Sequence, residues 1–389
     1  MLTAKAQYNL TNAEKYFKEH LSVGDHHVEG DYYSENNQVI GQWFGRGAEK
    51  LKLHGDVSLD DFVKLCHNVN PQTDELLTQR MRTNRRVFYD FTLSPPKSVS
   101  IVALAGGDYR VERAHERATV SALHELEKFA AARVRKNGAS GFRNTGNIVA
   151  AVFKHDTSRA LDPHLHCHCV VFNATHDAAE QKWKALETYE MLQAAKFAEN
   201  VYYHELAQEL KRMGCGIQNN PRGDFEIIGV SPELIARFSK RHNEIDKKTH
   251  KLLEQEPDKR GRNLKEIREH IAHDERTRKI KDIGRKRLTE LWDRQISNEE
   301  TVALAALKQC RTIKPVKGTA VEKAVAWAEQ HLFDRRSVVN EFELWRYALE
   351  RGRGENFSLK NLQSFTKRKP YVRDETQRGK ITTHATLGR

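Results

Sequence analysis

Alternating apolar and polar positions predict three strands in the first half of the chain. Residues 88–93 (FYDFTL) alternate so that Asp90 and Thr92 face away from the aromatic and apolar side chains, as in a half-buried strand. Residues 147–155 (NIVAAVFKH) and 164–172 (HLHCHCVVF) are also strand-like, and the short polar segment between them favours antiparallel pairing. Their high apolar content predicts a place near the centre of a sheet.

Helical patterns alternate with these strands. Thr11-x-x-Glu14 matches a capping box that would open a helix at 11–21. Alanine, leucine, glutamate and arginine dominate 111–136, which predicts a long helix, and 235–295 is densely charged and helical. We therefore expect an α+β fold in which helices flank a central antiparallel β-sheet, with the charged helices as a lid.

The length of 389 residues suits more than one core. We expect a domain over 1–300 and, over 301–389, a helical extension followed by a basic linker. Within 318–370 the pattern predicts two helices, the second with Ser337 as candidate N-cap. The last stretch, 351–389, has ten Lys and Arg against three acids, which indicates a flexible basic linker.

Charge and cysteine content narrow the class of protein. The net charge of +12 suits a polyanionic partner, and nucleic acid is the first candidate. The five cysteines are scattered without a C-x-x-C motif, which favours a reducing cytoplasm over a disulfide framework. The N-terminus has no apolar signal region, and no run approaches the roughly 18 apolar residues that span a bilayer, so we expect no membrane insertion.

The most informative segment is the histidine-rich strand. Its alternation places His164, His166 and His168 on one face, with Cys167 and Cys169 among the apolar residues on the other. Three histidines in five positions are hard to explain as solvated edge residues. The cysteines, being on the opposite face, are better explained as core thiols than as metal ligands.

Strand geometry limits how these histidines can share one ion. His164 and His168 lie roughly 13 Å apart along a strand, so neighbours two residues apart suit a single ion better. The sequence leaves open whether that pair is His164 with His166 or His166 with His168. A third ligand is expected from the preceding strand, where His155 is the candidate. Three histidines can also hold a purely structural ion.

A metal beside a basic surface suggests phosphodiester chemistry, which also needs a nucleophile. Tyr16 and the pair Tyr32-Tyr33 lie in polar or capped segments. A phenol has a pKa near 10 and needs a metal or base nearby. Asp90 could accept the proton or orient a ligating histidine. The expected DNA contacts are Lys97, Arg159 and Arg46.

Six motifs, in this order, resemble the relaxase domain of MobF-type conjugative relaxases, which nick plasmid DNA at the origin of transfer. They are Tyr16-Phe17, Tyr32-Tyr33, residues 43–49 (WFGRGAE), Asp90 with 94–98 (SPPKS), residues 155–159 (HDTSR) and residues 163–168 (PHLHCH).

The resemblance implies a fold and a set of roles. The fold would be the HUH or Rep-like relaxase fold, with a divalent metal ion (Mg, Mn, Zn or Ni) on His155, His166 and His168. It implies that Tyr16 attacks first and becomes joined to the DNA 5′ end, that Tyr32 performs a second strand transfer, and that Asp90 assists. Family members often carry a second tyrosine where this chain has Phe17, which puts any role for that hydroxyl in doubt.

The same resemblance implies partners and surroundings. The implied partners are single-stranded DNA at the origin, relaxosome accessory proteins, and the conjugation coupling and secretion machinery. The protein is expected to be a monomer in the bacterial cytoplasm that passes with the DNA to the recipient cell. We expect the chain to precede a helicase, since it carries no phosphate-binding G-x-x-x-x-G-K-[ST] loop of its own.

Two alternatives stay open. A rolling-circle replication initiator would share the histidine strand and the tyrosine, although residues 43–49 and the C-terminal extension favour the conjugative type. A non-catalytic basic DNA-binding protein with a structural zinc would bind DNA with steep salt dependence but leave it uncut.

Overall fold

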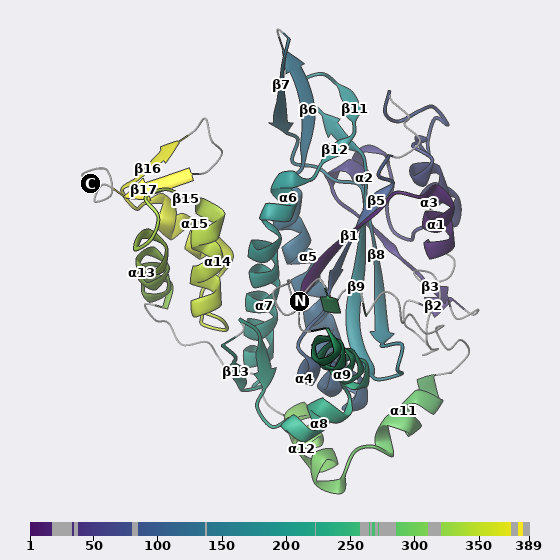
Figure 1. The fold of residues 1–389 in the computed structure, drawn as a ribbon, viewed down its shortest axis with the longest axis vertical. Coiled ribbons are helices and arrows are strands. Elements are labelled where there is room, and N and C mark those ends of the chain that lie inside the picture. The colour runs from purple at the N-terminus through teal and green to yellow at the C-terminus, as the bar shows by residue number, and fades with distance from the viewer. Residues whose placement is uncertain are drawn as a thin grey trace.

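Five antiparallel strands form the central sheet of the computed structural model (Figure 1). Across the sheet they are β1 (Leu2–Gln7), β5 (Phe88–Leu93), β9 (Pro163–Phe172), β8 (Ala150–Thr157) and β4 (Gln42–Phe44). The three predicted strands and the antiparallel pairing of β8 with β9 are confirmed, and β9 is the middle strand. The structure describes residues 1–17, 33–34, 38–79, 85–136, 138–221, 223–256, 264, 267–268, 271, 285–309, 320–374 and 380–383.

Helices cover both faces of this sheet, which confirms the α+β expectation. On one face, α5 (Tyr109–Glu127) and α7 (Ala195–Arg212) pack against the apolar side chains of β5 and β9. On the other, α1 (Leu10–Tyr16) and α3 (Leu59–Cys66) pack against a cluster of phenylalanines. Burial of these two apolar surfaces is the main source of stability.

The remaining elements of this body are short or peripheral. The helices are α2 (Arg46–Lys50), α4 (Lys97–Ser100), the π-helix η2 (Ile101–Ala105), α6 (Tyr189–Gln193), α8 (Pro232–Arg237), α9 (Lys240–Gln255), α11 (Arg285–Asp293) and α12 (Asn298–Lys308). The strands are β2 (Tyr33–Ser34), β3 (Gln38–Val39), β6 (Ala131–Lys136), β7 (Ala139–Asn144), β10 (Thr175–Asp177), β11 (Lys182–Lys184), β12 (Leu186–Glu187), β13 (Ile217–Asn219) and β14 (Phe225–Ile227).

The predicted helix over 111–136 is wrong in its last part. Helix α5 ends at Glu127, and β6 and β7 then form an antiparallel hairpin that projects from the sheet (Figure 1). Between them stands Asn137-Gly138, with Gly138 at φ 79°. Asn-Gly between alternating segments is a strong hairpin signal, and it outweighs the helical preference of the residues before it.

The N-terminal helix also begins differently from the prediction. It begins at Leu10, so Thr11 lies inside the helix and is not its N-cap. Residues 18–21 of the predicted helix lie outside the described residues. The charged helical region is confirmed where it is described, as α8, α9 and α11.

A second, smaller unit follows the main body. It contains α13 (Ala320–Phe333), α14 (Glu341–Arg351), α15 (Leu359–Lys367), β15 (Val339–Asn340), β16 (Tyr371–Asp374) and β17 (Lys380–Thr383), with strand order β15-β17-β16. Its apolar core includes Phe197 and Val201 of α7, which attaches it to the main body (Figure 1). The expected division near residue 300 stays a prediction, and Leu304 and Leu307 of α12 pack with the main core.

Two predictions for this unit are corrected. The N-cap of α14 is Asn340 rather than Ser337, because Asn340 and Glu343 form a complete capping box. The stretch 351–389 is not simply a flexible linker, since it contains α15, whose N-cap Ser358 forms a capping box with Asn361, and the strands β16 and β17. The number of charged residues does not reveal α15, because its apolar residues recur at helical spacing between the lysines.

The cysteines and the membrane expectation can be compared with the structure directly. Cys66, Cys167, Cys169 and Cys215 are buried, which agrees with the core position expected for Cys167 and Cys169, and burial raises the pKa of the Cys167 thiol to about 12. Cys310 lies outside the described residues. Of the helices described, none has the length and apolar character that crossing a bilayer requires.

Phe62 of α3 joins the N-terminal helix to the sheet. Its ring is buried, 4.4 Å from the ring of Phe17 and 5.1 Å from that of Phe172. We predict that Phe62→Ala lowers the free energy of unfolding by about 3–5 kcal/mol, because it leaves a cavity between α1, α3 and the sheet. Urea unfolding measures this. Leu59→Ala, at an exposed position of the same helix, is the control, and equal losses in both variants would contradict this account of the core.

Candidate active site

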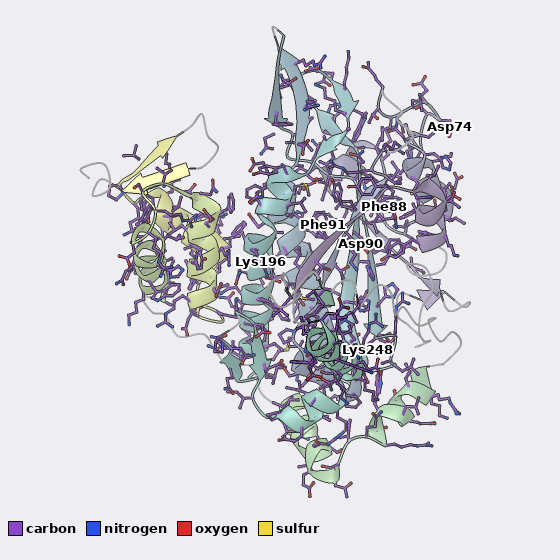
Figure 2. The ribbon with its side chains drawn as sticks, in the orientation of Figure 1. Asp74, Phe88, Asp90, Phe91, Lys196 and Lys248 are labelled. Atoms are coloured by element: carbon purple, nitrogen blue, oxygen red, sulfur yellow. The ribbon has the colours of Figure 1, made fainter. Side chains whose placement is uncertain are left out.

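One face of the sheet changes from apolar to polar along three neighbouring strands. On β5 the phenylalanine at 88 is followed on the same face by Asp90 and Thr92, and on β8 Phe153 is followed by His155. On β9 the same change runs from Phe172 back towards the histidines. The apolar part packs with α1 and α3, and the polar part begins where α1 ends. Figure 2 shows Phe88 and Asp90 on β5.

The register of β8 and β9 gathers three histidines. His155 lies directly opposite His166. The ring centroid of His155 is 5.3 Å from that of His166 and 5.3 Å from that of His168, and the latter two are 5.1 Å apart. His164 stacks on His166 at 4.8 Å. The structure therefore brings the predicted ligand set together, with His164 next to it.

The spacing of these rings suits a shared metal ion. Three imidazoles that each bind through one nitrogen at about 2.1 Å have ring centres about 5 Å apart in tetrahedral coordination. Nδ1 of His166 lies 2.9 Å from the carbonyl oxygen of His164, and Nδ1 of His168 lies 2.7 Å from Asp90 Oδ2. Nε2 is then the nitrogen of each ring that would face an ion.

The spacing of the three rings fits a shared ion, but the positions of their donor atoms do not yet form a metal site. Over the residues that the structure describes, no three His, Cys, Asp or Glu side chains meet the full geometry of a metal site. The strands hold the three rings at the separation that a single ion requires. The donor chemistry and the spacing fit a divalent metal.

Asp90 is the polar centre of the site. Its buried Oδ2 accepts a hydrogen bond of 2.7 Å from the hydroxyl of Tyr16 and one of 2.7 Å from Nδ1 of His168. Burial alone would raise the pKa of this carboxyl, but the charge and hydrogen bond of His168 and the hydrogen bond of Tyr16 outweigh it and hold the pKa below its usual value. Asp90 is therefore an ionised acceptor at neutral pH.

Tyr16 is the last residue of α1 and lies at the boundary between the apolar and polar parts of the face. Its hydroxyl is 3.5 Å from Nδ1 of His168, and the two rings meet edge to face at 6.2 Å. The next residue, Phe17, is buried and packs on Phe62 and on Phe153, at 5.7 Å from the latter. Phe17 thus anchors the end of the helix in the core and leaves Tyr16 at the site.

Tyr32, the second predicted catalytic tyrosine, lies outside the described residues. Thr92, which was not among the predicted site residues, lies with its hydroxyl 3.2 Å from Nδ1 of His168. Its position two residues after Asp90 on the same face is the signal that could have identified it.

Two of the predicted DNA contacts lie near the histidines. Lys97, at the start of α4, donates to the carbonyl oxygen of Pro163 at 2.9 Å. Burial lowers the pKa of this lysine to about 8, against the opposing charges of Asp162 and Glu226. Arg159 lies in the turn between β8 and β9. Their contact with DNA stays a prediction.

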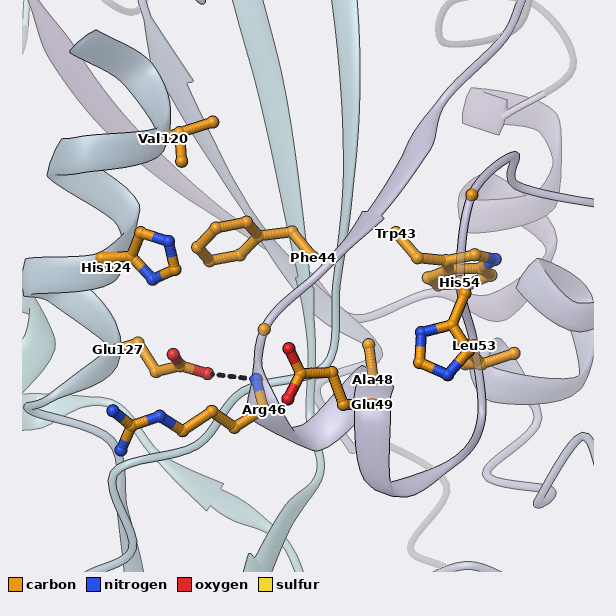
Figure 3. Close-up of a pocket in the computed structure, with 12 residues that line it drawn as sticks. Trp43, Phe44, Arg46, Ala48, Glu49, Leu53, His54, Val120, His124 and Glu127 are labelled. Carbon is orange, nitrogen blue, oxygen red and sulfur yellow. Dashed lines mark hydrogen bonds between the residues drawn. The ribbon is translucent and has the colours of Figure 1, made fainter. Parts of the chain in front are cut away.

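Arg46 lies in a different part of the molecule. It is exposed at the start of α2, and its backbone N–H donates to Glu127 Oε1 at 2.8 Å beside a pocket that Phe44 and His124 also line (Figure 3). Phe44 pairs with Ala150 of β8, five residues before His155, which is about 17 Å along a strand. Any contact of Arg46 with DNA would therefore be distant from the histidines.

The charged helices attach at the end of the sheet beside the histidines. The backbone N–H and the Nζ of Lys240, at the start of α9, contact the carboxylate of Asp162 at 3.0 and 3.2 Å. Nε1 of Trp292 in α11 donates to the carbonyl oxygen of Leu161 at 2.7 Å. These contacts fix the β8–β9 turn, and the closing movement of a lid stays a prediction.

Known relatives share both the sequence and the fold. The model of the TrwC relaxase family matches residues 10–299. The multifunctional conjugation protein TraI of Escherichia coli strain K12 is 40% identical over 217 residues, which are 56% of this chain and 12% of TraI. The matched part is thus a small fraction of that relative.

Solved structures of the conjugative relaxase TrwC are similar over most of the chain. For a copper-bound complex with oriT DNA, the TM-score is 0.66 and the identity is 29%, and the match covers 79% of this chain and 98% of the TrwC chain in that structure. A complex with a 27-mer DNA comprising the recognition hairpin and the cleavage site has a TM-score of 0.62 and 27% identity, with the same coverage. With three quarters of its length matched by the family model, this chain belongs to the TrwC relaxase family.

Proposed function

We propose that this chain nicks one strand of DNA at a plasmid origin of transfer and becomes joined to the new 5′ end through Tyr16. The observation that carries the proposal is the hydrogen bond from the Tyr16 hydroxyl to Asp90, beside the three grouped histidines. A phenol, an ionised acceptor and a candidate metal site adjoin on one polar face of the sheet. That arrangement suits phosphoryl transfer to a tyrosine.

The reaction exchanges one phosphodiester for another. The Tyr16 oxygen forms a bond to phosphorus as the bond between phosphorus and the 3′ oxygen breaks, and the 3′ oxygen leaves as a hydroxyl once it is protonated. The phenol gives up its proton. Because the number of phosphodiester bonds is unchanged, the reverse joining reaction requires no ATP.

Asp90 is better suited to orient groups than to keep the proton of the phenol. An ordinary carboxyl has a pKa near 4 and a phenol near 10, so a proton that stayed on Asp90 would cost roughly 8 kcal/mol. Asp90 instead fixes the direction of the Tyr16 hydroxyl and the tautomer of His168. The phenol proton then passes to solvent or to the leaving oxygen.

A divalent cation held by His155, His166 and His168 would polarise the scissile phosphate and neutralise the charge that develops on its oxygens. Three imidazoles suit zinc, nickel, copper or manganese better than magnesium, which prefers oxygen ligands. The copper-bound relative is consistent with this donor set. The native metal is not selected by the residues.

The partner we propose is single-stranded DNA, lying along the polar part of the sheet face that begins where α1 ends. The DNA complexes of TrwC support this choice. We also propose that Tyr32 performs a second strand transfer, and that the protein acts as a cytoplasmic monomer with accessory proteins and the conjugation machinery, and accompanies the DNA to the recipient.

Tyr16→Phe removes the nucleophile and should abolish the covalent adduct. The adduct is measured as a slow band when a labelled single-stranded oligonucleotide carrying the cognate origin is incubated with the protein and separated under denaturing conditions. Tyr8→Phe, at an exposed position nearby, is the control and should retain full activity. An undiminished adduct with Tyr16→Phe would remove the proposed mechanism.

Asp90→Asn keeps the shape of the side chain but removes its charge. We predict a rate of adduct formation about 10- to 100-fold lower, because the variant no longer holds the tautomer of His168 through an ionised acceptor. Quenched time courses give the rate. Asp334→Asn makes the same change at an exposed position and serves as control. A normal rate with Asp90→Asn would mean that this carboxylate has no part in the reaction.

The histidines can be separated by their effect on metal binding. Alanine at His155, His166 or His168 should weaken binding of a divalent ion by more than about 100-fold, as measured by calorimetric titration, and chelation should eliminate the adduct of the unaltered protein. His164→Ala is the matched control and should change affinity far less. A larger loss of metal affinity from His164→Ala than from His168→Ala would show that the ion binds His164 and His166 instead of His166 and His168.

A further inference from the structure

The C-terminal unit carries an aromatic cluster on its surface. Trp327 and His331, one turn apart on α13, stack with ring centroids 5.1 Å apart and planes 7° apart. Tyr347 of α14 lies 4.6 Å from His331 and 6.5 Å from Trp327. Trp327 is 37% exposed, and His331 is exposed as well. Tyr347 is half-buried and also packs against the core of the unit, which includes Leu344 of α14.

Cationic side chains border this cluster, which consists of Trp327, His331 and Tyr347. Lys323 lies four residues before Trp327 and therefore on the same side of α13, and the exposed Arg335 follows in the turn after α13 ends at Phe333. The guanidinium of Arg346 lies over the ring of Tyr347 at 4.7 Å. Arg351, one turn beyond Tyr347 on α14, is exposed.

Several acidic groups around the cluster are already paired with other cations. Glu343 bonds Arg336 at 3.1 Å, Glu341 bonds Arg373 at 3.2 Å, and Glu329 bonds Lys369 at 3.1 Å. Three further acids, Glu322, Asp334 and Glu350, lie beside Lys323, Arg335 and Arg351 in the sequence. Buried Nε of Arg346 makes no hydrogen bond to the residues described. The four bordering cations thus keep a surface that suits an anionic ligand.

We infer that this surface binds single-stranded DNA, with bases stacked on Trp327 and Tyr347 and phosphates near Lys323, Arg346 and Arg351. Flat aromatic rings that are at least partly exposed and bordered by cations bind unpaired bases with little sequence preference, whereas bases in a duplex are already stacked. The inference rests on the proposed function, because the substrate proposed there is itself unpaired DNA. The surface lies beyond residues 10–299, which the family model matches.

Photo-crosslinking locates such a site directly. The whole chain is irradiated with single-stranded DNA that contains 5-iododeoxyuridine and no origin sequence, and the crosslinked peptides are identified by mass spectrometry. We expect crosslinks at Trp327 or Tyr347 and their loss with Trp327→Ala and Tyr347→Ala. Crosslinks confined to residues 1–300 would overturn the inference.

Binding measurements test the energetic contribution. Trp327→Ala should weaken binding of the same DNA by about 5-fold or more, Trp327→Phe should weaken it less, and Val338→Ala, also exposed in this unit, should leave it unchanged. Lys323→Gln should lower the slope of log K against log salt by about 0.7. An unchanged affinity of Trp327→Ala for this DNA would contradict the proposed ligand. A change in the sedimentation of Trp327→Ala would also contradict it, because it would show that the surface makes contact between copies of the chain.

The two proposals can fail separately. Adduct formation by Tyr16 on a short origin oligonucleotide, which occupies only the active site, should be unchanged in the Trp327 and Tyr347 variants. A normal adduct without crosslinks at this surface would remove only the present inference. Absence of an adduct in the unaltered protein would remove the proposed function.

Discussion

The site depends on one buried carboxylate. Oδ2 of Asp90 accepts hydrogen bonds from both the Tyr16 hydroxyl and Nδ1 of His168, so a single atom determines where the phenol points and which nitrogen of the imidazole faces the other histidines. A buried ionised carboxylate is costly unless it is hydrogen-bonded. Because both partners depend on it, the nucleophile and the candidate metal site have a fixed relative position.

The fold supplies this arrangement by dividing one sheet face into two parts. The apolar part binds α1 and α3 through a cluster of phenylalanines, and Phe17 secures the end of α1 in that cluster. The polar part begins one residue earlier in the chain, at Tyr16. Phe17 therefore has a clear structural role here.

Much of this arrangement follows from the sequence. Period-two alternation predicted the three strands and the shared face of the histidines, and the short connection predicted that His155 would return beside them. Alternation alone could not choose between the two histidine pairs, because that choice depends on the register across β8 and β9. Nor could it show that Asp90 contacts Tyr16, since 74 residues separate them in the chain. The hairpin of β6 and β7 replaces the end of the predicted helix because the turn preference of Asn137-Gly138 outweighs the helical preference of the residues before it. Net charge could not predict the helix in the C-terminal stretch, because α15 forms through apolar residues spaced along one face between its lysines.

The most direct test identifies the residue that becomes joined to DNA. Protein incubated with single-stranded origin DNA and the divalent metal would be digested with nuclease and protease, and the peptide that retains nucleotide would be sequenced by mass spectrometry. The account predicts a nucleotide attached through its 5′ phosphate to Tyr16. Attachment at another residue as the first product, or cleavage that leaves no nucleotide on the protein, would contradict it.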